Sequence, residues 1–252
     1  MFQDKVPEKR GAKEPRQEII TGRSLERASE DFRYVPVIIK RTDETRRHPD
    51  DILEVAIGAG LEQIRRAPLS LGLSAVAAGL ILGFTAMSVA VVTADMGEVA
   101  ATELTRLAVA IVYPLGFVVC MMSGAELFTE HTATAVYPVL DRRASILGLF
   151  QLWIVVLLGN LLGTVFSSYL LSSADAVIGA SAGYIEIGKH LVTFDSGPLF
   201  VSALLAGWLM ALGAWLILAT PPTVSQVVSI YIVTFIIGLG ELHHSIAGSA
   251  EM

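Results

Sequence analysis

The chain has 252 residues, of which 53% are hydrophobic and 17% are charged, whereas about 25% of the residues in a typical soluble domain carry a charge. Of its 18 Lys and Arg residues, 14 lie before position 67, and only four follow in the remaining 186 positions. A soluble globular protein cannot cover its surface with so few charges, so the composition excludes that class and indicates an integral membrane protein with a charged N-terminal tail.

The first 48 residues are predicted to be a charged, disordered tail, because they contain three prolines and show no sustained periodicity. Residues 49–66 are predicted to form an amphipathic helix. Pro49 and Asp50 suit its first turn, and apolar residues recur at helical spacing as far as Arg65 and Arg66. Since this helix leads directly into an apolar segment, we expect it to lie in the membrane interface.

Residues 67–252 are predicted to form a transmembrane domain. It contains long apolar segments at 67–93, 107–140, 145–171, 198–219 and 227–252, and each meets the length of about 20 residues that a membrane span needs. The second segment is too long and too polar at its centre for one regular helix, and the fifth also carries ionisable residues. Both are therefore predicted to be broken spans.

The charges between the spans predict the orientation of the chain. The tail and the 141–143 turn carry most of the basic residues, whereas the loops at 94–106 and 172–197 are acidic. Because cytoplasmic loops are enriched in Lys and Arg, we expect the tail and the 141–143 turn in the cytoplasm and the acidic loops outside. The chain is then a multi-pass protein of the cytoplasmic (inner) membrane with a cytoplasmic N-terminus.

The two broken segments are similar to each other. One reads Ser-Gly-Ala-Glu-Leu-Phe-Thr-Glu-His at 123–131 and the other Gly-Leu-Gly-Glu-Leu-His-His-Ser at 238–245. Two corresponding interrupted spans are typical of an inverted repeat with a site near the membrane midplane. The first half supplies three spans and the second only two. We therefore expect an all-α inverted repeat of three plus three helices whose last helix is missing, with the chain truncated in its fifth span.

Ionisable residues within these broken segments are the candidate pathway residues. A charge at a helix centre costs at least about 2.5–3.5 kcal/mol on insertion scales, and such residues usually face a cavity. An alternative role for Glu126 and Glu241 is to bind backbone freed at the helix breaks. A histidine pair is harder to explain by packing, so His244 is the stronger candidate. The full set is Glu126, Glu130, His131, Glu241, His243 and His244.

Other chemistries are less well supported by the sequence. Glu241, His243 and His244 offer ligands to a divalent cation, so a metal transporter stays an alternative, but adjacent histidines on a helix point about 100° apart and no metal-binding spacing occurs. Cys120 is the one cysteine and there is no nucleophile elbow, so we expect no enzymatic activity, no catalytic residue, no bound metal and no cofactor. The net charge of −6 disfavours nucleic acid as a partner.

Lys189 is the one basic residue after Arg143. Its ordinary role is that of an interfacial lysine, and the sharper alternative is an electrostatic lure for an anion at an outer vestibule. The tryptophans, Trp153 among them, are expected to pack or to lie in the interfacial belt.

These motifs resemble those of the formate/nitrite transporter family. Gly-Ala-Glu-Leu-Phe-Thr at 124–129 resembles the loop in its second helix, and His-Ser-Ile-Ala at 244–247 resembles the run around its central histidine. Gly188-Lys189 and Leu-Leu-Ala-Gly-Trp-Leu at 204–209 are similar to the vestibule lysine and the fourth helix of the family. The resemblance covers residues 50–252.

The resemblance implies a six-helix, aquaporin-like protomer that assembles in the lipid bilayer as a homopentamer with one pore per subunit. It implies small monovalent anions, such as formate or nitrite, as substrates. By motif, Leu127, Phe128 and Thr129 fall on the constriction loop, His244 on the central histidine and Lys189 on the vestibule lysine.

The chain departs from the family pattern in the pore region. His243 stands where the family has Glu, His131 where many members have Asn, and Gly248-Ser249 where the family has Asn-Met. These departures leave the identity of the transported anion open.

The expected mechanism avoids moving a bare anion through a dry constriction, which faces a Born penalty of order 20 kcal/mol in the idealised low-dielectric limit. Lys189 concentrates the anion, His244 hydrogen-bonds or protonates it, and the neutral acid passes the apolar collar at Leu127 and Phe128. The alternatives are a neutral-solute or water channel on the same fold, and a divalent-metal transporter that uses Glu241, His243 and His244.

Overall fold

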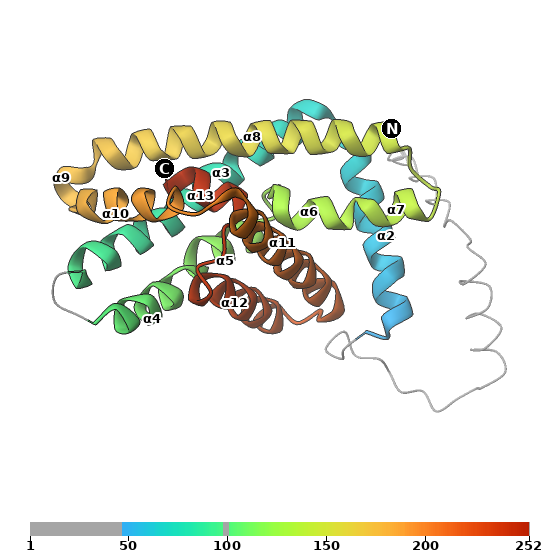
Figure 1. Cartoon of the computed structure of the whole chain (residues 1–252). Coiled ribbons are helices and arrows are strands. Elements are labelled where there is room, and N and C mark those ends of the chain that lie inside the picture. The colour runs from blue at the N-terminus through green and yellow to red at the C-terminus, as the bar shows by residue number, and fades with distance from the viewer. Residues whose placement is uncertain (1–46, 98–100, 252) are drawn as a thin grey trace, which may run out of the picture. The chain divides into compact units, whose positions relative to one another are not determined.

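The computed structural model describes residues 47–97 and 101–251, and within these ranges every regular element is a helix (Figure 1). The tail expected at 1–48 falls almost entirely outside the described residues. Four stretches are long and apolar enough to cross a membrane: Pro68–Met96, Thr102–Met122, Ile146–Ser173 and Ser196–Ala219. The helices are α2 (Pro49–Arg65), α3 (Pro68–Met96), α4 (Thr102–Val112), α5 (Pro114–Met122), α6 (Phe128–Thr134), α7 (Val136–Leu140), α8 (Ile146–Ser173), α9 (Asp175–Ile178), α10 (Ser181–Leu191), α11 (Ser196–Ala219), α12 (Thr223–Leu239) and α13 (Ser245–Glu251).

Helix α2 has clear signals at both ends. Pro49 occupies its first turn, and the side chain of His48 accepts a hydrogen bond from the backbone N–H of Asp50. The helix ends at Arg66, whose backbone is extended, two residues before the proline that starts α3. In Figure 1, α2 runs across the direction of α8. This orientation suits an interfacial helix, and that position stays a prediction.

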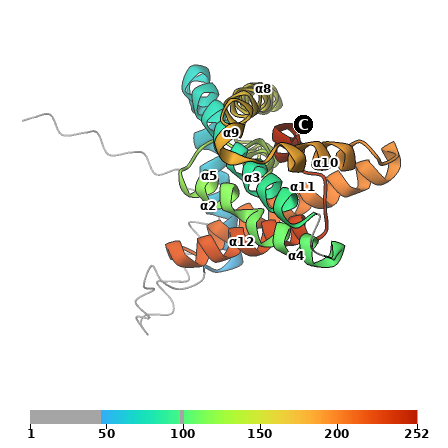
Figure 2. The ribbon, with the colours of Figure 1, turned by 90° about the vertical axis from the view of Figure 1, so that its left-hand side faces the viewer.

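The most extensive helix pair is α3 with α8, and glycines bring their backbones close together. A Cβ atom on Gly79 of α3 would lie 2.2 Å from the carbonyl oxygen of Asn160, and one on Gly163 of α8 would lie 2.3 Å from that of Val76. In a membrane, where apolar side chains gain little by leaving lipid, such small residues allow the close contact that holds helices together. Helix α10 also packs on α3 (Figure 2).

Two interrupted membrane segments give the fold its internal symmetry. The first breaks at 123–127, between α5 and α6, and the second breaks at 240–244, between α12 and α13. Helix α6 packs on α11, the first long helix of the second half, and α13 packs on α3, the first long helix of the first half. This reciprocal packing is the one that an inverted repeat produces, and the predicted all-α, aquaporin-like fold class is confirmed.

The acidic segment at 172–197 differs from the loop that its charges indicate, because it contains α9 and α10. Gly183 explains how α10 reaches the rest of the protein. A Cβ atom at this position would lie 1.9 Å from the carbonyl oxygen of Ala90 on α3, so glycine lets the two helices touch through their backbones.

Substitution of Gly79 tests the close approach of α3 and α8. We expect Gly79→Ala to lower the melting temperature of the purified protein in detergent, because the new methyl group overpacks the contact at a cost of about 1–3 kcal/mol. The matched control is Gly72→Ala in the same helix, where an added Cβ would lie 3.7 Å from its nearest neighbour, Cγ1 of Val155. An equal melting temperature for the two variants would contradict this explanation.

Candidate functional site

The second residue of each helix break lies in the left-handed backbone region. After α5, Gly124 has a φ of +70°, and after α12, Glu241 has a φ of +51°. At the second break the N–H of Glu241 donates to the carbonyl of Gly238, and that of Leu242 donates to the carbonyl of Ile237. This pattern is a Schellman motif, which pairs carbonyls that a helix end leaves free.

Glu241 takes a conformation that usually requires glycine, and its side chain is held by two neighbours. Its carboxylate lies 3.6 Å from Nε of Arg106 and 3.4 Å from Nε2 of His190. The same Arg106 Nε donates to the carbonyl oxygen of Leu239 at 2.7 Å. Arg106 thus caps the C-terminal end of α12, where a cation complements both the free carbonyls and the helix dipole.

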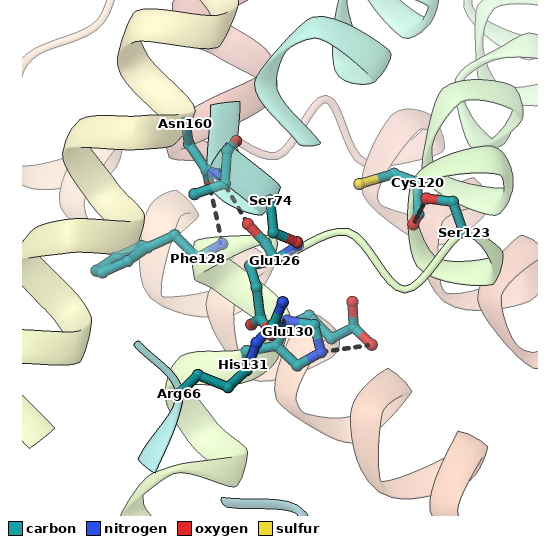
Figure 3. A network of polar contacts seen from close by, with 10 residues as sticks. Arg66, Ser74, Cys120, Ser123, Glu126, Phe128, Glu130, His131 and Asn160 are labelled. Atoms are coloured by element: carbon teal, nitrogen blue, oxygen red, sulfur yellow. Dashed lines mark hydrogen bonds and ion pairs between the residues drawn. The ribbon is translucent and has the colours of Figure 1, made fainter. Parts of the chain in front are cut away.

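Asn160 of α8 holds the first break in place (Figure 3). Its amide nitrogen donates to the carbonyl oxygens of Ala75 and Glu126, both at 2.8 Å, and its amide oxygen accepts from the N–H of Phe128, also at 2.8 Å. Ser74 accepts from the N–H of Glu126 at 3.2 Å. Two side chains therefore pair backbone groups on both sides of Leu127, in place of helix hydrogen bonds lost at the break.

A buried polar network joins α2 to the first break (Figure 3). Glu126, whose side chain is 4% exposed, forms an ion pair with Nη1 of Arg66, and its other carboxylate oxygen lies 3.0 Å from Nδ1 of His131. The second ring nitrogen of His131 lies 3.8 Å from the buried carboxylate of Glu130. Because a buried carboxylate requires a compensating charge or hydrogen bonds, Arg66 and His131 are what make Glu126 tolerable here.

His244 lies where the two breaks meet. Its Nδ1 accepts a hydrogen bond from the backbone N–H of Ala247 at 3.1 Å, and its Nε2 lies 2.7 Å from Oγ1 of Thr129. Since Nδ1 is an acceptor, the neutral ring carries its proton on Nε2 and donates it to Thr129. The ring also packs edge-on against Phe117, with centroids 5.0 Å apart.

Two cavities reach His244 from different sides. The first, of about 220 Å³, lies between α3, α4, α10 and the second break, and Arg106, Glu186, His190, Glu241 and Glu251 line it with ionisable groups. The second, of about 360 Å³, is lined by Phe128, Thr129, Thr132, Ala133, Val136, Trp153, Ala203, Ala206, Gly207, His243, His244 and Ser245. Among the described residues, His244 is shared by the linings of both cavities.

The other predicted pathway residues are divided between several places. His243, Phe128 and Thr129 line the second cavity and Glu241 lines the first. Leu127 is fully buried in the core and lines neither cavity.

Two predicted residues lie away from the cavities altogether. His131 belongs to the network with Arg66 and Glu126. Lys189, with a side chain that is 71% exposed, lies 3.9 Å from Glu186 and is not part of the first cavity's lining. Any action of Lys189 on an anion therefore operates at a distance.

Three functional neighbours are not evident in the sequence. Arg66 is part of an interfacial Arg pair, Arg106 is one of few charges near a span end, and Asn160 is a single amide within an apolar run. Of these, only Asn160 could have been singled out from the sequence, because a polar residue in the middle of a membrane helix usually has a specific partner. The partners of all three lie between 32 and 133 positions away along the chain, beyond the reach of local patterns.

A metal site gains no support from the geometry. Over residues 47–97 and 101–251, no group of three or more His, Cys, Asp and Glu side chains is placed to hold an ion.

Comparisons with known proteins agree on one family. A sequence model described as "Formate/nitrite transporter" matches residues 50–252. The inner membrane protein YfdC of Escherichia coli K12 is 30% identical over 196 residues, which cover 77% of this chain and 62% of that protein. A probable formate transporter of Methanothermobacter thermautotrophicus is 27% identical, with coverages of 68% and 69%. The chain thus spans less than two thirds of the length of the E. coli relative.

Solved structures show the same fold. An FNT family ion channel superposes with a TM-score of 0.71 at 21% identity, over 80% of this chain and 81% of that one. A pentameric formate channel with formate bound gives a TM-score of 0.63 at 21% identity, over 73% of each chain.

A double-mutant cycle tests the pair of Arg66 and Glu126. We expect Arg66→Gln to destabilise the protein by about 3–5 kcal/mol, because it leaves a buried carboxylate without its cation. The double variant with Glu126→Gln should recover part of this loss, which gives a coupling energy of about 1–3 kcal/mol in thermal or denaturant unfolding. Arg65→Gln is the control at the same helix end, and additive effects in the cycle would rule out the coupling.

Proposed function

Because this chain belongs to the formate/nitrite transporter family, we propose that it conducts small monovalent anions of weak acids, such as formate or nitrite, across the cytoplasmic membrane. The observation that carries this proposal is the position of His244. It lies at the meeting point of both helix breaks, is 4% exposed, and lines a cavity on each side. The name of one structural neighbour, a pentameric formate channel with formate bound, supports the choice of substrate.

His244 is proposed to be the group that receives the anion. Its Nε2–H already has a hydroxyl acceptor in Thr129, and an anion arriving from either cavity offers a stronger one. When the anion replaces Thr129 as the acceptor, the Nε2–H group of His244 therefore stays hydrogen-bonded throughout. A buried donor that is never left unpaired avoids a penalty of about 1–3 kcal/mol.

The apolar surroundings of His244 favour transfer of the solute as a neutral acid. Phe117 covers one edge of the imidazole, and Phe128 lines the second cavity next to Thr129. Leu127, which directly precedes Phe128 in the chain, is fully buried. We propose that Leu127 and Phe128 form an apolar collar that excludes the hydrated anion. Protonation near His244 would remove most of the desolvation cost.

The charges at the first cavity are proposed to form the entrance. Arg106 and His190 flank Glu241 there, and Lys189 lies outside the cavity on α10. We propose that Lys189 acts as a long-range lure that raises the local concentration of anions. Arg106 caps the end of α12 and also lines this cavity.

We propose that the protein forms a homopentamer, as the name of one structural neighbour says of that channel, with its N-terminus in the cytoplasm. Large apolar side chains on α8 and α11 are exposed on the isolated protomer, among them Leu158, Phe166, Leu204 and Trp208. Exposed apolar side chains in such number suit contact with lipid or with neighbouring copies.

Flux measurements in proteoliposomes test the role of His244. We expect formate and nitrite uptake by the wild type to rise as the external pH falls, because neutral-acid transfer consumes a proton. His244→Ala should lower the flux by about ten- to a hundredfold, the loss expected for one hydrogen bond to a charged group, and should flatten the pH dependence. His48→Ala, at an exposed position before α2, is the control.

Two results would count against these assignments. An unchanged pH profile in His244→Ala would overturn the proton relay. Osmotic swelling of the liposomes without any flux of formate or nitrite would favour a neutral-solute or water channel.

The proposed electrostatic attraction of anions by Lys189 predicts that its effect on uptake depends on salt concentration. We expect Lys189→Ala to raise the KM for anion uptake about two- to fivefold at low ionic strength, the scale of an exposed charge interaction, and to have no effect near 1 M salt, where such charges are screened. Lys189→Arg keeps the charge and should behave as wild type. An effect that persists at high salt would mean that Lys189 acts by contact.

A further inference from the structure

The carboxyl groups that line the first cavity are not all compensated. Arg106 is the one Lys or Arg among the described lining residues, whereas three carboxyl groups line the cavity, those of Glu186, Glu241 and Glu251. Glu241 lies 3.6 Å from Arg106, and Glu186 lies 3.9 Å from Lys189. Glu251 is only 9% exposed, and its side chain forms no hydrogen bond or ion pair with any described residue. Its carboxyl group therefore needs an explanation of its own.

Glu251 lies on the same side of α13 as His244. Seven positions separate the two residues, and on an α-helix such residues share a face about 10.5 Å apart. The carbonyl oxygen of His244 accepts the N–H of Gly248 at 2.8 Å, so the helical repeat extends back to the histidine. Both side chains line the first cavity. The cavity thus connects the unpaired carboxyl group to the imidazole.

Contacts with α8 give the order of the two residues along the cavity. Thr129, the partner of His244, follows the residue whose N–H donates to Asn160 of α8. The carbonyl oxygen of the residue before Glu251 accepts a hydrogen bond at 3.2 Å from Oγ of Ser168, eight positions further along α8. From there α8 leads to the acidic segment that is expected to lie outside. Glu251 therefore lies on the outer side of His244.

The groups around Glu251 favour its protonated form. The titratable residues that line the cavity with it are Arg106, Tyr113, Glu186, His190, Glu241 and His244. Helices α3 and α8 also pack on α13 and add none to the described lining, and the acid and histidine of α6 belong to the network at the first break. Since a buried carboxylate without a cation or hydrogen-bond donors is costly, Glu251 is expected to hold a proton.

We propose that Glu251 is the proton donor for the anion that His244 receives. The O–H bond of Glu251 breaks, water in the cavity passes the proton on, and an O–H bond forms on the anion, which continues as the neutral acid. The cavity, of about 220 Å³, has room for several water molecules. The carboxylate left behind regains a proton from the outer solution. The inference rests on the proposed function for the anion, and it names the source of the proton.

This role of Glu251 leaves His244 neutral throughout. The ring keeps the hydrogen bond that its Nδ1 accepts from Ala247, and its Nε2–H stays available to the anion. The anion of a weak acid can take the proton from a carboxyl group, whereas the anion of a strong acid, such as chloride, cannot. Glu251 would therefore couple each anion to one proton and select for weak acids.

The variant Glu251→Gln tests the donor in proteoliposomes that contain the full chain. We expect the maximum rate of formate uptake to fall about a hundredfold, the factor for carrying one uncompensated charge on insertion scales. The KM should stay within about twofold of wild type, because His244 still binds the anion. Uptake by the variant should no longer rise as the external pH falls. Diffusion of formic acid through lipid is subtracted with protein-free liposomes.

Two further variants separate the proton from the shape of the side chain. Glu251→Asp keeps a carboxyl group and should restore most of the rate and the pH dependence. Glu103→Gln is the matched control, because this exposed acid in the first turn of α4 is outside the lining of the cavity, and it should behave as wild type.

Infrared spectroscopy detects the proton on Glu251 without any transport. At neutral pH the difference spectrum between wild type and Glu251→Gln should contain the carbonyl-stretching band of a protonated carboxylic acid, contributed by the wild type. The absence of this band would overturn the proposal.

The transport results distinguish this proposal from the proposed function. A Glu251→Gln variant with the rate and pH profile of wild type overturns the role of Glu251 and leaves anion transport intact. Equal losses in Glu251→Gln and Glu251→Asp would mean that the shape of the side chain matters and would also overturn it. Absence of formate and nitrite uptake by the wild type overturns the proposed function itself.

Discussion

Backbone hydrogen bonding at the two helix breaks is the constraint on which the rest of the structure depends. Inside a bilayer each unpaired N–H or C=O group costs several kcal/mol, so a span can be interrupted only where the protein replaces the lost bonds. At the first break Asn160 and Ser74 supply the replacements from α8 and α3. At the second break a Schellman motif, Arg106 and the imidazole of His244 supply them.

The same constraint determines where charge is found. Glu126 lies in the first break, and Arg66 and His131 compensate it from the end of α2 and from α6. Glu241 lies in the second break between Arg106 and His190. Each break therefore carries a carboxylate with basic partners, but the first group is buried and the second opens into a cavity. Two segments with similar sequences thus provide a buried ionic network at one break and a carboxylate that lines a cavity at the other.

The sequence predicted the repeat, and it predicted less of the site. The Glu-Leu pairs in Gly-rich apolar segments were sufficient to locate both interruptions, because charge inside a span is rare and costly. The grouping of side chains was harder to predict. His131 and His244 carry the same chemistry and both lie close to a break, yet one pairs with Glu126 and the other with Thr129. Which partner each finds depends on the packing of α6 against α11 and of α13 against α3, and no local pattern encodes that packing. Trp153 was expected to pack or to lie in the interfacial belt, and only the structure shows that its buried indole nitrogen has no hydrogen-bond partner among the described residues.

The hydrogen bond from Ala247 to Nδ1 of His244 has a mechanical consequence. To become an imidazolium, the ring must take a second proton, and Nδ1 is the atom that would receive it. A protonated Nδ1 can no longer accept the N–H of Ala247, so charging the ring removes one hydrogen bond from the first turn of this short helix, while the bond from the N–H of Gly248 to the carbonyl oxygen of His244 does not involve the ring. Protonation of Nδ1 and this capping bond are therefore mutually exclusive. Because loss of a helix N-cap costs about 0.5–2 kcal/mol, the charged imidazole corresponds to a less stable start of α13.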